Sequence, residues 1–190
     1  MTGEDARSHV ALLRGVNVGS HHRIAMADLR DVAASLGWED VATYIQSGNL
    51  VFHATGSVTA LADSLGEAIA ERLDVRCGVV VLTRRQLARV VADNPFPDET
   101  DPKRLHVVFH QGSPGPDAAA TLAAAVARAR EKGSRDDGTV VGHYLYLHTP
   151  DGLGRSRLAA ELARRPAADA PEGTMRNWAT VTRLLALLDG

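Results

Sequence analysis

Apolar residues in the first half of the chain recur at two spacings, one typical of helices and one typical of strands. The run HVALLRG, which begins at residue 9, is of the kind found in buried strands, and the helical pattern that follows it ends at Gly37. The predicted elements are, in order, strand 9–13, helix 25–36, strand 41–46, strand 50–54, helix 59–73 and strand 77–83. This order, βαββαβ, is that of a ferredoxin-like unit.

The pattern partly repeats in the second half of the chain. A short helix over 84–92 leads into the Pro- and Asp-rich segment 94–103, which has the composition of a linker. The elements predicted after it are strand 105–111, helix 117–131, strands 137–141 and 143–149, and helices 153–164 and 174–188. The fourth strand of a second βαββαβ unit is missing from this pattern.

We therefore expect an α+β protein of two ferredoxin-like subdomains, with antiparallel sheets and helices on one face of each sheet. Residues 1–93 form the first subdomain, 94–103 the linker, and 104–190 the second subdomain with the C-terminal helices. The second subdomain is expected to be incomplete or modified, because its last strand is replaced or missing.

Two polar segments of the first subdomain are expected to meet in space. In a ferredoxin-like unit, the loop after the first strand and the turn between the second and third strands lie at one edge of the sheet. Here they are RGVNVGSHHR at 14–23 and QSGN at 46–49. Gly15 and Gly19 allow positive φ or a close approach to a bound group, and the helix N-terminus that follows attracts anions. The alternative is that both segments are ordinary turns, made of the residues that turns favour.

A third polar segment, TMRNWATV at 174–181, opens the last predicted helix. With Thr174 as the N-cap, Arg176 and Asn177 fall in the first helical turn. An arginine there opposes the helix dipole at small cost, but it suits an anion shared by its guanidinium and the backbone N–H groups. The alternative places Trp178 in the core and leaves Arg176 solvated.

Other motifs give weaker signals. The segment PDGLGRSRL at 150–158 has two glycines before a helix, but the third glycine of a dinucleotide loop is missing. On a strand, His106 and His110 lie about 13 Å apart, too far to share one ion. The adjacent His21 and His22 are candidate acid–base groups, and we predict no metal site.

The overall composition is ordinary for a soluble globular protein. Of 190 residues, 45% are hydrophobic and 23% charged, and the formal net charge is −2, so nucleic-acid binding would need a local basic patch. Aromatic residues make up only 4%. Tyr44 and Phe52 are candidates for surface stacking, but core packing is the favoured interpretation of both. Cys77, the only cysteine, excludes an intramolecular disulfide and fits a reducing compartment. With no secretory signal or membrane span in view, we expect a cytoplasmic protein with no membrane association.

Several motifs in combination are similar to one bacterial family. ALLRGVNVG, MADLR, TYIQSGNLVF, NPF, SRL and TMRNWATVTRLL follow one another over nearly the whole chain, which resembles the domain-of-unknown-function 1697 family. The resemblance implies a pair of ferredoxin-like subdomains, and it implies no activity. The chain departs from the family pattern at 20–23, where SHHR replaces a Gly- and Lys-rich stretch, and at Ala179, where the family tends to have asparagine.

The leading hypothesis is binding of an anionic, phosphate-bearing small molecule such as a nucleotide, with no cofactor. Arginine suits bidentate phosphate contacts, and side-chain amides fix orientation. The residues predicted to form the site are Arg14, Asn17, Gly19, Arg23, Gln46, Ser47, Asn49, Arg176 and Asn177. The alternatives are an RNA-binding module and a protein-interaction module. The sequence leaves open whether a reaction follows and what the oligomeric state is.

Overall fold

In a computed structural model, the described residues are 7–19, 23–164 and 173–190. By their mutual contacts they form two compact units. The first holds the described residues of Met1–Arg89 together with Thr182–Gly190, and the second holds those of Val90–Val181. The role of residues 94–103 as a linker between two independently folding parts stays a prediction.

The first unit is a complete ferredoxin-like fold. Its sheet has the strand order β2-β3-β1-β4, and all neighbouring strands are antiparallel. The elements are β1 (His9–Leu13), α1 (Met26–Ser35), β2 (Glu39–Thr43), β3 (Asn49–His53), α2 (Val58–Leu73) and β4 (Val79–Thr83). The predicted order βαββαβ is therefore confirmed for this half of the chain.

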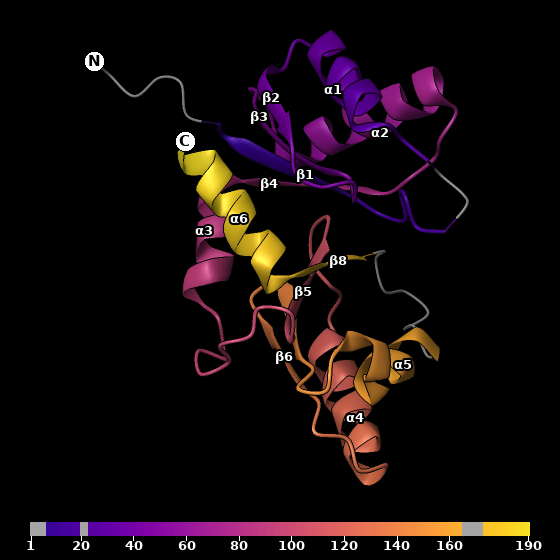
Figure 1. The fold of residues 1–190 in the computed structure, drawn as a ribbon, viewed down its shortest axis with the longest axis vertical. Helices are drawn as coiled ribbons and strands as arrows, with labels where there is room; N and C mark the ends of the chain where they lie inside the picture. The colour runs from indigo at the N-terminus through magenta and orange to yellow at the C-terminus, as the bar shows by residue number, and fades with distance from the viewer. Residues whose placement is uncertain (1–6, 20–22, 165–172) are drawn as a thin grey trace. The chain divides into compact units, whose positions relative to one another are not determined.

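Helices α1 and α2 cover one face of this sheet (Figure 1). Leu29 of α1 and Leu65 of α2 are fully buried against it. Trp38, which follows α1, stacks on Phe52 of β3 with 3.9 Å between the ring centroids. Phe52 is therefore a core residue, as favoured over surface stacking by the sequence analysis.

The second unit repeats the topology of the first. Its strand order is β6-β7-β5-β8, again antiparallel throughout. The elements are β5 (Leu105–His110), α4 (Ala118–Glu131), β6 (Asp137–Val141), β7 (Tyr144–His148), the 3₁₀ turn η1 (Leu153–Arg155), α5 (Arg157–Arg164) and β8 (Gly173–Asn177). The unit is a complete βαββαβ fold, so the expectation of an incomplete second subdomain is wrong.

The strand that the sequence pattern did not show is β8. It pairs antiparallel with β5 from Gly173 opposite His110 onward, and α6 (Trp178–Asp189) begins only after it. The helix predicted over 174–188 is therefore four residues too long at its start. Backbone pairing along the open edge of β5 outweighs the local helical pattern, an effect that periodicity alone does not reveal.

Helices α3 (Arg84–Ala92) and α6 extend beyond the two repeated patterns, and the boundary between the units falls within each of them. Inside the first unit, two arginines hold the C-terminal end of α6. Arg7 Nη1 donates to the Leu187 carbonyl at 2.9 Å, and Arg84 Nε donates to Asp189 Oδ1 at 2.6 Å. In the parts of the chain that the structure describes, no helix combines the length and apolarity needed to cross a membrane.

Candidate functional site

The loop after β1 and the turn between β2 and β3 lie against each other at one edge of the first sheet. The Leu13 N–H donates to the Gly48 carbonyl at 2.8 Å, and Asn17 Nδ2 donates to the Gln46 carbonyl at 2.9 Å. We call residues 14–19, 23–25 and 44–48 the loop–turn edge. The structure thus brings together the two segments that topology predicted would meet.

Asn17 fixes the shape of the loop. Its Nδ2 also donates to the Ile24 carbonyl at 2.9 Å, and its Oδ1 accepts from the Ile24 N–H at 2.9 Å. The Asn17 backbone is left-handed, with φ 56°, a conformation that asparagine tolerates better than most residues. Its side chain therefore closes the loop onto itself and onto the turn.

Asn49 does the same for the turn. It is fully buried, and its Nδ2 donates to the Tyr44 carbonyl at 3.1 Å and to Ser47 Oγ at 2.8 Å. The backbone reinforces this closure, because the Tyr44 N–H donates to the Asn49 carbonyl at 3.0 Å. The observed contacts of Asn49 and Ser47 thus shape the turn.

Ile45 is a feature that the sequence analysis missed. The strand predicted over 41–46 ends at Thr43, because the Ile45 backbone turns into the left-handed region with φ 49°. That conformation is unusual for a β-branched residue. The sequence did not indicate this conformation of Ile45, because a single glycine, Gly48, is enough for an ordinary hairpin turn.

Two cations and one amide stand exposed on the loop–turn edge: Arg14, Arg23 and Gln46. Arg23 lies close in sequence to the first turn of α1, whose N-cap residue, Ala25, provides no side-chain cap. The backbone N–H groups of that turn carry a partial positive charge. Gly19 is exposed, with φ 67° and no atom within 4 Å of where a Cβ would be. The edge therefore presents positive charge on a backbone that hydrogen bonds hold in place.

Arg176 and Asn177 lie in the second unit, and neither is in a first helical turn as expected. Both belong to β8, where Arg176 Nη1 donates to Thr174 Oγ1 at 2.7 Å and to the Met175 carbonyl at 2.9 Å. Burial lowers the pKa of Arg176 to about 10. Asn177 Oδ1 accepts from the Thr180 N–H at 2.9 Å and so caps α6. This amide occupies the position where an anion was expected.

The glycine-containing segment 150–158 holds no open helix N-terminus. Asp136, which is almost completely buried, accepts from Ser156 Oγ at 2.9 Å and from the Leu158 N–H at 3.1 Å. Ser156 Oγ in turn accepts from the Ala159 N–H. A carboxylate of the protein itself therefore occupies the start of α5, so this segment lacks the open helix N-terminus of a phosphate loop.

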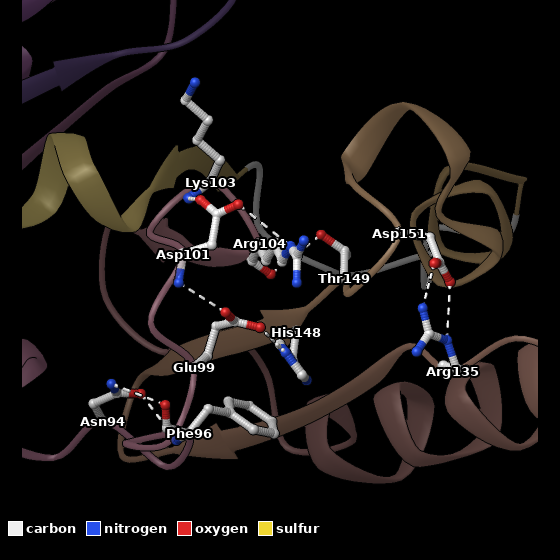
Figure 2. Close-up of polar contacts among 10 residues, drawn as sticks. All are labelled: Asn94, Phe96, Glu99, Asp101, Lys103, Arg104, Arg135, His148, Thr149 and Asp151. Atoms are coloured by element: carbon white, nitrogen blue, oxygen red, sulfur yellow. Dashed lines mark hydrogen bonds and ion pairs between the residues drawn. The ribbon is translucent and has the colours of Figure 1, made fainter.

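A histidine–carboxylate pair in the second unit was not predicted. His148 Nε2 and Glu99 Oε2 are 2.7 Å apart, and the ring of Phe96 stacks on the imidazole at 5.2 Å between centroids (Figure 2). The hydrogen bond from His148 is the main cause that lowers the pKa of Glu99. Glu99 and Phe96 fall in the segment interpreted as a linker, so the pair fastens that segment to β7.

The other candidate groups do not gather into a site. His106 and His110 are buried in β5, and burial lowers the pKa of both. Cys77 lines an open hollow beside α2, together with Glu67 and Glu71, and burial raises the pKa of its thiol. Among the described residues, no group of three or more His, Cys, Asp or Glu side chains is placed to hold a metal ion. His21 and His22 lie outside the described residues.

The two units define an α+β protein built of paired ferredoxin-like folds. Comparison with known families gives the family: the model for "Protein of unknown function (DUF1697)" matches residues 7–140, and the chain belongs to this family. No curated protein matches the chain.

A solved structure supports the fold. The chain is similar to the conserved bacterial protein SP0830 from Streptococcus pneumoniae, with a TM-score of 0.71 and 21% sequence identity, over 96% of this chain and 98% of that one. At this identity the likeness concerns the fold alone, and function has to be argued from side chains.

Proposed function

We propose that the loop–turn edge binds a phosphate-bearing anionic small molecule. The observation that carries the proposal is that Asn17 ties the loop to Ile24 and to Gln46, and so fixes the backbone just after Arg23 and just before the uncapped N-terminus of α1. Guanidinium groups and helix N–H groups are the donors that phosphate oxygens accept from most readily. The proposal concerns binding and assigns no reaction.

The predicted residues take two different roles in this proposal. Arg14, Arg23 and Gln46 are exposed and supply the contacts to the anion, while Asn17 and Asn49 hold the backbone that carries them. A backbone fixed before binding lowers the entropic cost of association. The contributions expected of Ser47, Gly19, Arg176 and Asn177 to ligand binding stay predictions.

The hollow beside α2 is a weaker candidate for the same ligand. Glu67 and Glu71 line it together with a single arginine, Arg76. Two carboxylates in so open a place repel a phosphate more than one guanidinium attracts it. The charge of the lining therefore favours the loop–turn edge.

RNA binding, the first alternative, is weakened by the burial of Phe52. RNA-binding sheets of this topology stack bases on exposed aromatic rings. Phe52 is fully buried beneath Trp38, and Tyr44 is only half-exposed. The described part of the sheet therefore offers little stacking surface.

The test is calorimetric titration with inorganic pyrophosphate. The wild type is expected to bind saturably, and Arg23→Gln is expected to raise Kd about tenfold or more, because a charge-assisted hydrogen bond contributes roughly 1.5–3 kcal/mol. Arg72→Gln is the matched control, since Arg72 is an exposed arginine in the last turn of α2. An equal loss in both variants, or no binding by the wild type at millimolar pyrophosphate, contradicts the proposal.

A further inference from the structure

Two large apolar side chains are exposed to solvent at the loop–turn edge. Val18 is 71% exposed and Ile45 is 53% exposed. Val18 follows Asn17 and Ile45 precedes Gln46, and the 2.9 Å hydrogen bond between Asn17 and Gln46 therefore brings both to the same edge. Among the described residues, Leu153 of the second unit is the other large hydrophobic residue with comparable exposure, at 38%.

The backbone conformation of the turn keeps Ile45 exposed. Its φ of 49° is costly for a β-branched side chain, and asparagine or glycine would adopt it with less strain. The turn is closed on both sides of it by the paired hydrogen bonds between Tyr44 and Asn49. A strained residue that is also exposed gains nothing from core packing, and strain of this kind concentrates at ligand-binding sites.

We propose that Val18 and Ile45 form an apolar shelf for the planar base of a nucleotide whose phosphates are held by the cations of the same edge. This inference rests on the proposed function and narrows its ligand class from phosphate-bearing molecules in general to nucleotides. A ligand site of this kind combines apolar contact area with a few polar groups that fix orientation.

The chemistry of the shelf separates nucleotides from other phosphate compounds. A sugar phosphate presents hydroxyl groups, which lose hydrogen bonds to water when they lie on alkyl side chains. A nucleobase presents an apolar face, so its burial against Val18 and Ile45 is favourable. A protein partner would need about 800 Å² on each side, whereas the shelf consists of two side chains.

The alkyl groups of the shelf contact the face of the base and read none of its edges. We therefore expect adenine and guanine nucleotides to bind within a few-fold of each other, since face contacts tolerate every base.

The experiment compares ADP, ribose 5-phosphate and inorganic pyrophosphate by calorimetric titration. The wild type is expected to bind ADP about tenfold more tightly than pyrophosphate and to bind ribose 5-phosphate no more tightly than pyrophosphate. Ile45→Asn is expected to weaken ADP binding about tenfold and to leave the Kd for pyrophosphate unchanged. Its melting temperature should be equal or higher, since asparagine accepts the left-handed backbone, and this excludes misfolding as the cause.

Leu153→Ser is the matched control, because it removes an exposed apolar residue from the second unit and should change neither Kd. If the wild type binds ADP and pyrophosphate equally, or if Ile45→Asn weakens both alike, the shelf is refuted while the phosphate site stands. If the wild type binds none of the three compounds, the proposed function fails and the shelf fails with it.

Discussion

At Gly48 the β2–β3 turn passes against β1 without room for a side chain. A Cβ on this residue would lie 2.5 Å from Val16 Cγ2 and 2.7 Å from Leu13 Cβ, and the backbone has φ 70°. Both neighbours are buried, so neither can move aside cheaply. Close packing and left-handed backbone therefore require glycine at the same residue.

Gly48→Ala is accordingly expected to lower the free energy of unfolding by about 2–4 kcal/mol, from overpacking together with backbone strain. Gly15→Ala is the control, since Gly15 has φ 69° but no atom within 4 Å of a Cβ, and only the backbone cost of about 1–2 kcal/mol should appear. Urea unfolding of the three proteins measures both values. Equal losses in the two variants would show that the contacts with Leu13 and Val16 contribute nothing.

The sequence predicted which segments meet better than it predicted the role of each side chain. The sequence placed Arg14, Asn17 and Gln46 at one edge, because the connections of a βαββαβ unit bring those segments together. It did not show that the Asn17 amide makes its hydrogen bonds within the loop and to the turn. The partners are backbone groups, which every residue carries, so the residue types give no sign of them. The left-handed Ile45 was equally invisible, because alternation of apolar residues continues past the end of the strand.

At the scale of secondary structure, the segment after α3 is fastened to β7 by the pair of Glu99 and His148. The carboxylate of Glu99 also accepts from the Asp101 N–H at 2.8 Å (Figure 2). Both hydrogen bonds favour the charged form and lower the pKa of Glu99 below its ordinary value of 4.5. A carboxyl group with a depressed pKa stabilises the fold above its unfolded pKa, and this stabilisation is lost as the pH falls through the folded value.

The free energy of unfolding is therefore expected to fall below about pH 4.5, and to fall less steeply in Glu99→Gln, which has no carboxyl group to protonate. Asp98→Asn is the control, because Asp98 is an exposed neighbouring carboxylate. Chemical unfolding measured between pH 3 and pH 6 tests this. Parallel profiles for the wild type and Glu99→Gln would show that the pair does not couple folding to pH.

Most helices and strands followed from periodicity, and the failures have identifiable causes. The apolar patterns of α1, α2 and α4 are long enough to define helices without tertiary information. β8 was assigned to a helix because its five residues continue directly into α6, and its pairing with β5 comes from far away in the sequence. Segment 94–103 lacks periodicity, so the sequence could not predict its attachment through Phe96 and Glu99.

At the scale of the whole molecule, the two units share one strand order but carry different side chains at equivalent edges. In the second unit, the loop after β5 is QGSPGPD at 111–117, and the turn between β6 and β7 is Gly142-His143. Neither contains an arginine, whereas 14–23 contains two. The fold thus provides this edge twice, and only the first copy has the charges that a phosphate requires. The proposed binding of phosphate therefore depends on these side chains and does not follow from the topology.

Backbone amide chemical shifts of ¹⁵N-labelled protein during titration with ADP test the central claim most directly. We predict saturable shifts at residues 14–19, 23–26 and 44–48, and unchanged positions at 111–117 and 142–143, the equivalent edge of the second unit. Shifts that concentrate in the second unit or around the hollow at Cys77, or the lack of any saturable shift, would contradict the account.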